Sequence, residues 1–312
     1  MKVYHTIESI EKIRNAVVTI GTFDGVHLAH QTIIKRVQTI VQETDGETVV
    51  VTFFPHPRIV LDPDAATNLK LLNTIKEKIA QIERNGIQHL VLIPFTKEFA
   101  ETSSEVFTQE ILVDKIGTKK LVIGYDHRFG KNRTGGLEYL KANATTFGFE
   151  VEEIPRQEID ETTISSSSIR KHLLDGEYQA AIDLLGYRYS LTGVVVKGAQ
   201  MGRTIGYPTA NIFIKETYKL IPADGVFAVK VRTEIGEFGG MLNIGNRPTM
   251  NGVGRTIEVN IFDFDADIYD QTISVELVAF IRKEQKFNGL EALKVQLAQD
   301  KIAAKVLLAQ ID

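Results

Sequence analysis

Two histidines three residues apart are the first residues of the chain whose types and spacing suit chemistry. His27 and His30 close the segment Thr19-Ile-Gly-Thr-Phe-Asp-Gly-Val-His-Leu-Ala-His30, where a strand-like run gives way to a glycine-bearing turn and a helix. Residues i and i+3 share one helix face, and a helix N-terminus attracts phosphate. The pair can therefore donate hydrogen bonds to oxygens that gain charge during phosphoryl or nucleotidyl transfer. A zinc pair or two exposed histidines are the alternatives, although no third ligand lies nearby in the sequence.

Two later segments fit the same kind of site. Gly124-Tyr-Asp-His-Arg-Phe-Gly130 follows a strand-like run, and Ile164-Ser-Ser-Ser-Ser-Ile-Arg170 places hydroxyl groups before a helix, where ordinary capping is the alternative. The spacing from Gly124 to Lys131 does not fit a Walker A loop, and no dinucleotide fingerprint is present. An ATP site in this half of the chain must therefore be of the histidine type.

The second half of the chain carries a different constellation. The glycine-rich run Gly198-Ala-Gln-Met-Gly-Arg-Thr-Ile-Gly206 leads into Tyr207-Pro-Thr-Ala-Asn211, and glycine lets a backbone approach a ligand closely. Thr209 and Asn211 offer the hard oxygen ligands that Mg²⁺ prefers. Glu258 stands in an apolar strand-like run, where it is either a general base or a strand residue that faces solvent.

The first half of the chain must position its residues on an α/β framework. Amphipathic stretches such as 28–43 alternate with short apolar runs, which favours a parallel sheet with helices on both faces. Such sheets bind ligands at the carboxyl ends of their strands. The runs expected to be strands are 17–20, 48–54, 89–93, 120–123 and 150–154.

The second half has the pattern of an antiparallel β-barrel or sandwich. Short runs rich in β-branched residues are separated by glycine, proline and asparagine, and residues 290–311 have helical periodicity. We therefore predict two domains, 1–186 and 187–312. The runs expected to be strands are 191–196, 210–214, 226–231, 239–244, 257–262 and 273–281.

Composition excludes several classes of protein. With 312 residues the chain is long enough for two domains, and a net charge of −4 gives no case for a nucleic-acid binder. The absence of cysteine excludes disulfides and thiolate metal sites. No apolar stretch approaches the roughly 18 residues that span a bilayer, and the N-terminus does not read as a secretory signal. We expect a cytoplasmic protein.

The ordered motifs resemble one family, the prokaryotic bifunctional riboflavin kinase/FAD synthetases, over nearly the whole chain. TIGTFDGVHLAHQ, FFPHP, GYDHRFGKNRTG and ISSSSIR are similar to the adenylyltransferase half of these enzymes. GRTIGYPTAN, NIGNRPT, IEVNIFDFDADIY and IRKEQKF are similar to the kinase half. The resemblance implies an α/β Rossmann-like nucleotidyltransferase domain followed by an antiparallel six-stranded riboflavin kinase barrel with a C-terminal helix.

The resemblance also implies two reactions: ATP phosphorylates riboflavin to FMN, and ATP then adenylylates FMN to FAD with release of pyrophosphate. Mg²⁺ is the implied cofactor, and riboflavin, FMN and ATP are the implied partners, with no nucleic acid, membrane or obligate protein partner. In the adenylyltransferase, the residues expected to bind ATP are Gly21, Thr22, Phe23, Asp24, His27, His30, Ser165, Ser166 and Arg170, of which the histidines and Arg170 are catalytic, and those expected to contact flavin are Asp126, Arg128 and Asn132. In the kinase, the residues expected to bind ATP are Gly198, Gly202, Arg203, Thr204, Gly206, Pro208, Thr209 and Asn211, those expected to contact flavin are Asn243, Arg247, Thr249 and the catalytic Glu258, and Thr209 and Asn211 are the metal ligands.

Four positions depart from the family pattern. Ala29 replaces the glycine of HxGH, His127 replaces a phenylalanine, Lys197 stands where histidine is common, and Asp270 replaces a glycine. The methyl group of Ala29 would crowd a nucleotide that packs against the turn. The alternatives are therefore a chain that retains only the kinase, with a flavin- or nucleotide-binding regulator as its first half, or a nucleotidyltransferase for another phosphorylated metabolite.

Overall fold

The computed structural model describes residues 1–124, 127–155, 164–198, 200–249 and 252–310. Contacts between Cα atoms divide the chain into two compact units, Met1–Ser166 and Ser167–Asp312. Each unit has its own sheet.

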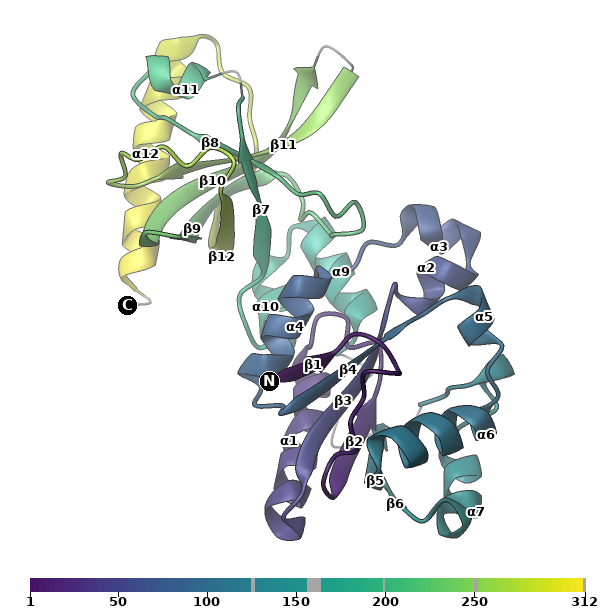
Figure 1. Ribbon diagram of the computed structural model, residues 1–312. Coiled ribbons are helices and arrows are strands. Elements are labelled where there is room, and N and C mark those ends of the chain that lie inside the picture. Colours follow the sequence, from purple (N-terminus) through teal and green to yellow (C-terminus); the bar gives the residue numbers. More distant parts are fainter. Residues whose placement is uncertain (125–126, 156–163, 199, 250–251, 311–312) are drawn as a thin grey trace. The chain divides into compact units, whose positions relative to one another are not determined.

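The first unit is built on a six-stranded sheet in which every pair of neighbouring strands is parallel (Figure 1). Their order across the sheet is β1-β4-β3-β2-β5-β6. The chain moves outward from β2 to β3 and β4 and then returns to the other side of β2 as β5. The carboxyl ends of β2 and β5 therefore flank the switch point at which ligands bind in such sheets. The strands are β1 (Lys2–Tyr4), β2 (Ala16–Ile20), β3 (Glu47–Phe54), β4 (His89–Pro94), β5 (Thr118–Gly124) and β6 (Glu150–Ile154).

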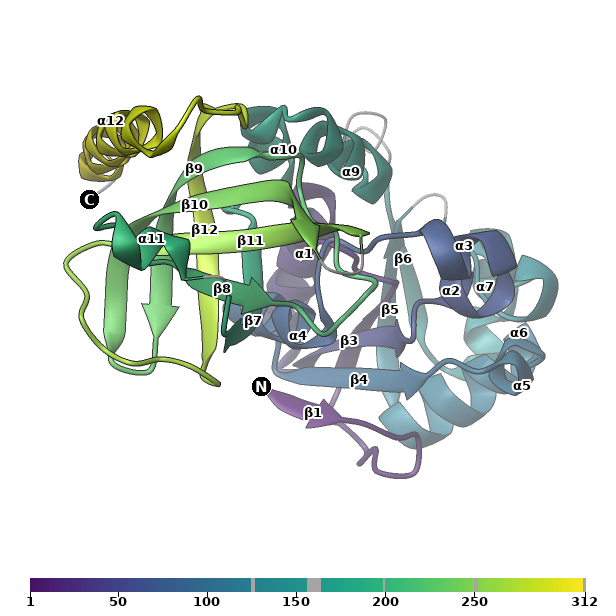
Figure 2. The ribbon, with the colours of Figure 1, turned by 90° about the horizontal axis from the view of Figure 1, so that it is seen from above.

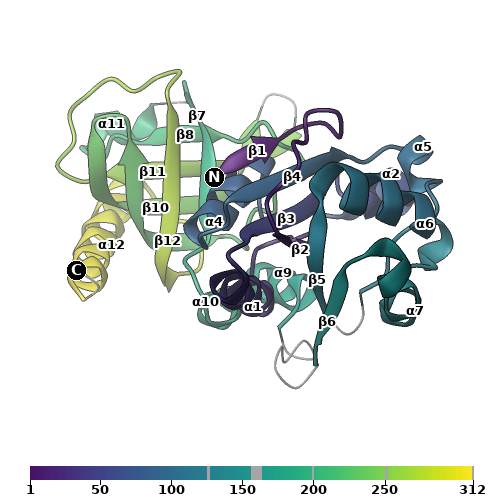
Figure 3. The same cartoon turned by 60° about the horizontal axis from the view of Figure 1, so that its bottom comes forward.

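Helices cover both faces of this sheet (Figure 3). Apolar side chains of α1 (Leu28–Thr44) and α4 (Ile75–Arg84) pack on one face, and those of η1 (Phe107–Ile116) and α7 (Leu137–Phe147) pack on the other. Within the described ranges, five short helical segments occupy the connections between these elements. They are α2 (Pro57–Leu61), α3 (Pro63–Asn68), α5 (Lys97–Ala100), α6 (Ser104–Val106) and η2 (Lys131–Arg133).

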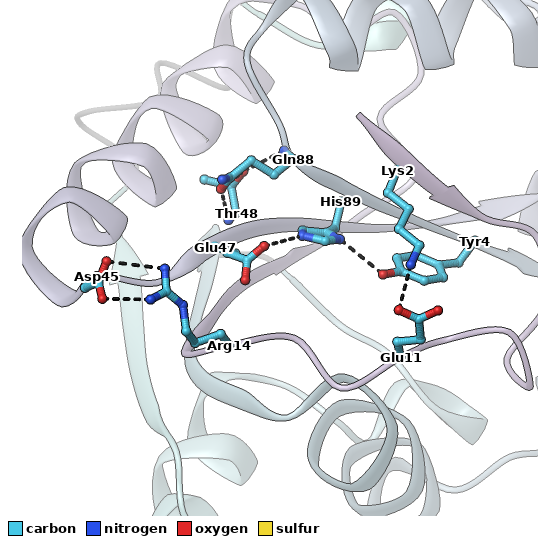
Figure 4. Close-up of polar contacts among 9 residues, drawn as sticks. All are labelled: Lys2, Tyr4, Glu11, Arg14, Asp45, Glu47, Thr48, Gln88 and His89. Atoms are coloured by element: carbon cyan, nitrogen blue, oxygen red, sulfur yellow. Dashed lines mark hydrogen bonds and ion pairs between the residues drawn. The ribbon is translucent and has the colours of Figure 1, made fainter.

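Polar side chains fix the edge strand β1, which has only three residues (Figure 4). The hydroxyl of Tyr4 lies 3.2 Å from Nδ1 of His89 on β4, and Nε2 of His89 lies 2.7 Å from a carboxylate oxygen of Glu47 on β3. Lys2 forms an ion pair with Glu11 at 2.7 Å. The Tyr4–His89–Glu47 chain of contacts thus links β1 to the amino-terminal ends of β4 and β3, opposite the switch point.

The second unit is a closed six-stranded barrel of order β10-β11-β8-β7-β12-β9, preceded by two helices (Figure 2). All of its strand pairs are antiparallel. The strands are β7 (Ser190–Val196), β8 (Ala210–Phe213), β9 (Gly225–Thr233), β10 (Gly236–Thr249), β11 (Gly252–Ile261) and β12 (Thr272–Arg282). The helices are α9 (Ser166–Asp175), α10 (Tyr178–Leu185), α11 (Met201–Thr204) and α12 (Leu290–Ala309).

Two of these helices pack directly on the barrel. On α12, Ala304 and Leu308 join an apolar cluster with Ala228 of β9 and Met241 of β10. On α10, the ring of Tyr178 meets the ring of Phe227 edge-on at 4.5 Å. The expected fold class, a parallel α/β sheet followed by a closed antiparallel barrel and a C-terminal helix, is confirmed.

Candidate active sites

The turn after β2 has a tightly held and strained backbone. Phe23 and Val26 have φ angles of 47° and 39°, in the left-handed region that residues with a side chain rarely adopt. The main-chain oxygen of Thr22 accepts hydrogen bonds from Oγ1 of Thr52 at 3.1 Å and from Nζ of Lys78 at 2.6 Å. Such strain persists only where the surroundings enforce it, and it is common at ligand-binding sites.

The histidine pair stands directly after this turn, at the start of α1. His27 is the N-cap residue, its side chain makes no capping hydrogen bond, and its ring stacks on that of His30 with a centroid distance of 3.7 Å. Burial, followed by the charges of His27 and Lys78, holds the pKa of His30 well below 6.5. Nδ1 of His30 has no hydrogen-bond partner among the described residues. The imidazole of His30, held neutral by this shift, and the free amides of a helix N-terminus together form a site for phosphate oxygens.

The methyl group of Ala29 does not take up space beside the histidine pair. Its side chain is 1% exposed and packs beneath the helix with Val17, Ile33 and Val122. The expectation that its methyl group would crowd a nucleotide is therefore wrong, because this methyl group is buried against β2 and β5.

The serine segment reaches the same turn through Ser166. Oγ of Ser166 donates a 2.9 Å hydrogen bond to the main-chain oxygen of Asp24. The carboxylate of Asp24 in turn accepts the main-chain N–H of Leu72 at 2.9 Å. Asp24, expected to bind ATP, therefore holds neighbouring loops in place. Ser165 is half-buried beside Ser166, whereas Arg170 lies in the second unit, where it donates to Oγ of Ser167, so its role beside the turn stays a prediction.

The segment after β5 adds an aromatic cluster that sequence reasoning missed. The ring of Phe129 lies 5.3 Å from that of Phe107, and Phe53 lies 5.7 Å from Phe95 and 6.5 Å from Phe107. Phe53 is the last residue but one of β3, Phe95 directly follows β4, and Phe129 lies in the segment after β5. The cluster therefore lies at the carboxyl edge of the sheet. The adjacent phenylalanines of the FFPHP motif were its only sequence signal.

Of the residues expected to contact flavin there, Arg128 and Asn132 are exposed, and Asp126 lies outside the described residues. His127 stacks on Phe129 at 5.7 Å. Burial, and then the charge of Arg133, lowers the pKa of His127 to about 4. Its Nε2 has no hydrogen-bond partner in the part of the chain that the structure describes.

In the second unit, strand register brings three predicted residues into one row. Glu258 of β11 is the cross-strand partner of Asn211 on β8 and of Asn243 on β10. Side chains of directly opposed residues point to the same face of a sheet. Glu258 is 7% exposed, and the hydroxyl of Thr209 donates to its carboxylate at 3.4 Å.

The glycine-rich run packs closely against this row. A Cβ at Gly198 would lie 2.3 Å from Nδ2 of Asn211, and one at Gly202 would lie 2.1 Å from the main-chain oxygen of Tyr207. Position 202 therefore requires glycine, whereas a side chain at position 198 would displace the amide of Asn211. Nδ2 of Asn260 donates to the oxygen of Pro208 at 2.6 Å, which fixes the start of β8.

The remaining predicted kinase residues lie around this row. Arg203 and Thr204 are exposed on α11, and Gly206 follows with a φ of 84°. Arg247 and Thr249 lie on β10, but their side chains are outside the described part of the chain. Of the family departures, Lys197 lies 5.9 Å from the ring centre of Tyr269, and Asp270 has a φ of 63°, a conformation that favours glycine.

The donor set around Thr209 and Asn211 suits a hard cation. The hydroxyl oxygen of Thr209 and the amide oxygen of Asn211 are of the kind that Mg²⁺ takes together with substrate phosphates, and the carboxylate of Glu258 lies beside them. Among the described residues, no group of three or more His, Cys, Asp or Glu side chains is placed to hold a metal ion.

Comparison with known proteins assigns the two units. The FAD synthetase family model matches residues 9–168, and the riboflavin kinase model matches residues 185–308. The bifunctional riboflavin kinase/FMN adenylyltransferase of Haemophilus influenzae is 39% identical over 295 residues, which is 94% of each chain. The chain belongs to this bifunctional riboflavin kinase/FMN adenylyltransferase family. The Listeria monocytogenes member is 37% identical over 299 residues, 96% of this chain and 94% of its own.

A solved structure from Streptococcus pneumoniae, described as a macrolide-efflux protein, has the same architecture. It is 32% identical, covers 97% of this chain and 98% of its own, and superposes with a TM-score of 0.86. Among the described residues, no helix combines the length and the apolar character needed to cross a membrane. The predicted family and its two ATP-dependent transferase activities are confirmed by the family models and relatives, and the single-activity alternative is not favoured.

Proposed function

We propose that the second unit phosphorylates a ribityl hydroxyl of riboflavin and that the first unit adenylylates the resulting FMN, with the residues described above as the machinery. The observation that carries this proposal is the row of Asn211, Glu258 and Asn243, which places a buried carboxylate among amide and hydroxyl oxygens. The stacked histidine pair at the switch point of the other sheet supplies the second, separate phosphate site.

In the kinase step, Glu258 acts as the general base. It accepts the proton of the ribityl hydroxyl while that oxygen bonds to the γ-phosphorus of ATP and the bond from phosphorus to the bridging oxygen breaks, which releases ADP. Thr209 and Asn211 would hold Mg²⁺, which supplies charge neutralisation on the phosphates when bound. The glycines at 198 and 202 let the backbone approach the nucleotide.

In the adenylylation step, a phosphate oxygen of FMN bonds to the α-phosphorus of ATP and pyrophosphate leaves. No protein nucleophile or base is needed, because the attacking oxygen is already ionised. His27 and His30 donate hydrogen bonds to the phosphate oxygens together with the first amides of α1 and the hydroxyl of Ser165, and the catalytic role of Arg170 rests on the family resemblance alone. The half-buried rings of Phe53 and Phe95 at the carboxyl edge offer a stacking surface for the planar flavin.

Chromatography of riboflavin, FMN and FAD after incubation of the purified protein with riboflavin, ATP and Mg²⁺ tests this proposal. We expect FMN to appear first and FAD to follow, and we expect FMN plus ATP to yield FAD and pyrophosphate in equal amounts. Chelation of the metal should stop FMN formation. Accumulation of FMN without FAD or pyrophosphate would instead favour a chain that retains only the kinase, and turnover of CTP or of another phosphorylated metabolite would favour a different nucleotidyltransferase.

A further inference from the structure

A buried lysine lies behind the turn that carries the histidine pair. Lys78, on α4, is 3% exposed, and its Nζ donates a 2.6 Å hydrogen bond to the main-chain oxygen of Thr22. Burial lowers its pKa to about 8, while the negative charge of Asp24 acts in the opposite direction. A buried ammonium group is costly unless something compensates its charge.

The surroundings of Lys78 compensate this charge only in part. An ammonium group has three N–H donors, and the carbonyl of Thr22 is the one hydrogen-bond acceptor that the described residues offer it. The carboxylate of Asp24 is also engaged elsewhere, by the main-chain N–H of Leu72. Asp24 therefore offsets the charge of Lys78 only through space, and the two N–H donors that the carbonyl of Thr22 does not take are left for an anion at the turn.

The field of Lys78 reaches the proposed phosphate site. Its charge is one of the causes that lower the pKa of His30, so the ammonium and this imidazole interact electrostatically. The oxygen of Thr22 that Lys78 binds belongs to the turn between β2 and α1, and Thr52 of β3 anchors the same oxygen from the sheet. Two donors from two different elements thus fix one carbonyl of the turn.

We infer that Lys78 is a positioning residue for adenylyl transfer: it fixes the carbonyl of Thr22, so that the turn amides face the nucleotide, and its charge attracts the triphosphate of ATP. This inference rests on the proposed role of the turn in the first unit. Residues of α4 had no part in the site expected from the sequence.

Four variants of the full chain separate charge from packing. Lys78→Met keeps the length of the side chain without its charge, Lys78→Arg keeps the charge, and Thr52→Val removes the other hydrogen bond to Thr22 without a change of charge. Lys76→Met is the matched control, because Lys76 is exposed on the same helix. Riboflavin kinase activity, measured on the same samples, should be unchanged in all four.

The expected result is a selective loss of ATP recognition in FAD synthesis. Lys78→Met should raise the KM for ATP about tenfold or more, the factor for one lost charge-assisted hydrogen bond, and leave the KM for FMN within about twofold. Lys78→Arg should recover most of the loss, Thr52→Val should have a smaller effect than Lys78→Met, and Lys76→Met should match the wild type.

The dependence of kcat/KM for ATP on pH distinguishes the charge of Lys78 from its packing, because a purely structural role would not depend on the protonation of Lys78. Since the charged form is required, kcat/KM for ATP in the wild type should fall as pH rises through about 8, where Lys78 loses its proton. Asp24 and His30 interact with Lys78 through charge, His27 stacks on His30, and all three are retained in Lys78→Arg. A falling limb that they cause would survive in that variant, whereas a limb caused by Lys78 should move to higher pH.

The inference is overturned if Lys78→Met leaves the KM for ATP within twofold, or if the falling limb is absent from the wild type or survives in Lys78→Arg. If Lys78→Met does not fold, the profiles of the wild type and Lys78→Arg decide alone. His30→Ala is measured alongside. A loss of FAD synthesis in His30→Ala but not in Lys78→Met refutes only this inference, whereas no loss in either variant also refutes the proposed role of the turn.

Discussion

Glu258 on β11 and Asn211 on β8 are cross-strand partners, and Asn243 faces Glu258 from the other neighbouring strand. The three residues lie far apart in the sequence, so only the register of the barrel brings them together. A one-residue slip of either pairing would turn one of these side chains to the opposite face. The kinase site therefore depends directly on correct strand pairing in the second unit.

Glu258→Gln should lower riboflavin phosphorylation by about 100-fold or more, the usual cost of losing a general base. The amide keeps the size of the side chain but accepts no proton at neutral pH, so the KM values should change little. FAD formation from supplied FMN should be unaffected, since that reaction belongs to the first unit. Steady-state assays of both reactions on the same sample measure this.

The control for Glu258→Gln is Glu234→Gln, which makes the same chemical change at an exposed turn between β9 and β10. It should have wild-type activity in both assays. Full kinase activity in Glu258→Gln would show that this carboxylate is not the base.

Single substitutions of the histidine pair should each lower FAD synthesis by about 10²- to 10³-fold, as when one preorganised donor to a charged transition state is removed. The rings of His27 and His30 stack at 3.7 Å, so each positions the other, and the double variant should lose less than the product of the two single effects. Kinase activity serves as the internal reference, and the exposed His5→Ala is the matched control. If His27→Ala and His30→Ala both make FAD at the wild-type rate, the site lies elsewhere.

His127 should make the protein sensitive to acid. Its pKa is about 4 in the folded state because of burial, against about 6.5 in an unfolded chain, so between these pH values the unfolded state binds more protons. The free energy of unfolding should therefore decrease as pH falls from about 7 towards 4, and His127→Phe should reduce this loss by about 3 kcal/mol. Urea denaturation at a series of pH values measures the difference.

The control in that series is His5→Phe, at an exposed position, which should retain the full acid sensitivity. The pKa of His30 is also lowered by burial, so its protonation likewise lowers the free energy of unfolding as pH falls. Because His30 is present in all variants, some acid sensitivity should remain in His127→Phe. Identical pH dependence in the wild type and His127→Phe would show that the imidazole is protonated without cost.

The sequence predicted the main elements well because periodicity reflects burial. The strand β6 was expected at residues 150–154 and spans Glu150–Ile154, and α1 was expected at 28–43 and spans Leu28–Thr44. The strand β1 was missed, because three edge residues with a charged lysine carry no apolar run, and its place depends on long-range contacts such as Tyr4 with His89.

The candidate sites were predictable only where their residues are contiguous. The turn before α1 and the run before Asn211 are local motifs, so their chemistry was visible in the sequence. Lys78 and the ring of Phe107 come from other elements and reach the carboxyl edge only through packing. The orientation of Ala29 was misjudged for the same reason, since a motif does not say which face of a helix meets the core.

The second unit should fold and act as a kinase without the first. The kinase motifs begin after Gly186, and we predict that a fragment of residues 187–312 folds and phosphorylates riboflavin without making FAD. This fragment lacks α10, however, whose Tyr178 packs on Phe227 and donates a 2.7 Å hydrogen bond to the oxygen of Ala223. A fragment that starts at residue 167 should therefore melt at a higher temperature than one that starts at 187, and Tyr178→Ala in the longer fragment should remove about 3 kcal/mol or more of stability, the usual cost of deleting a buried aromatic ring. Circular dichroism melts and kinase assays on the three proteins measure this, and aggregation of both fragments without activity would show that the second unit needs the first in order to fold.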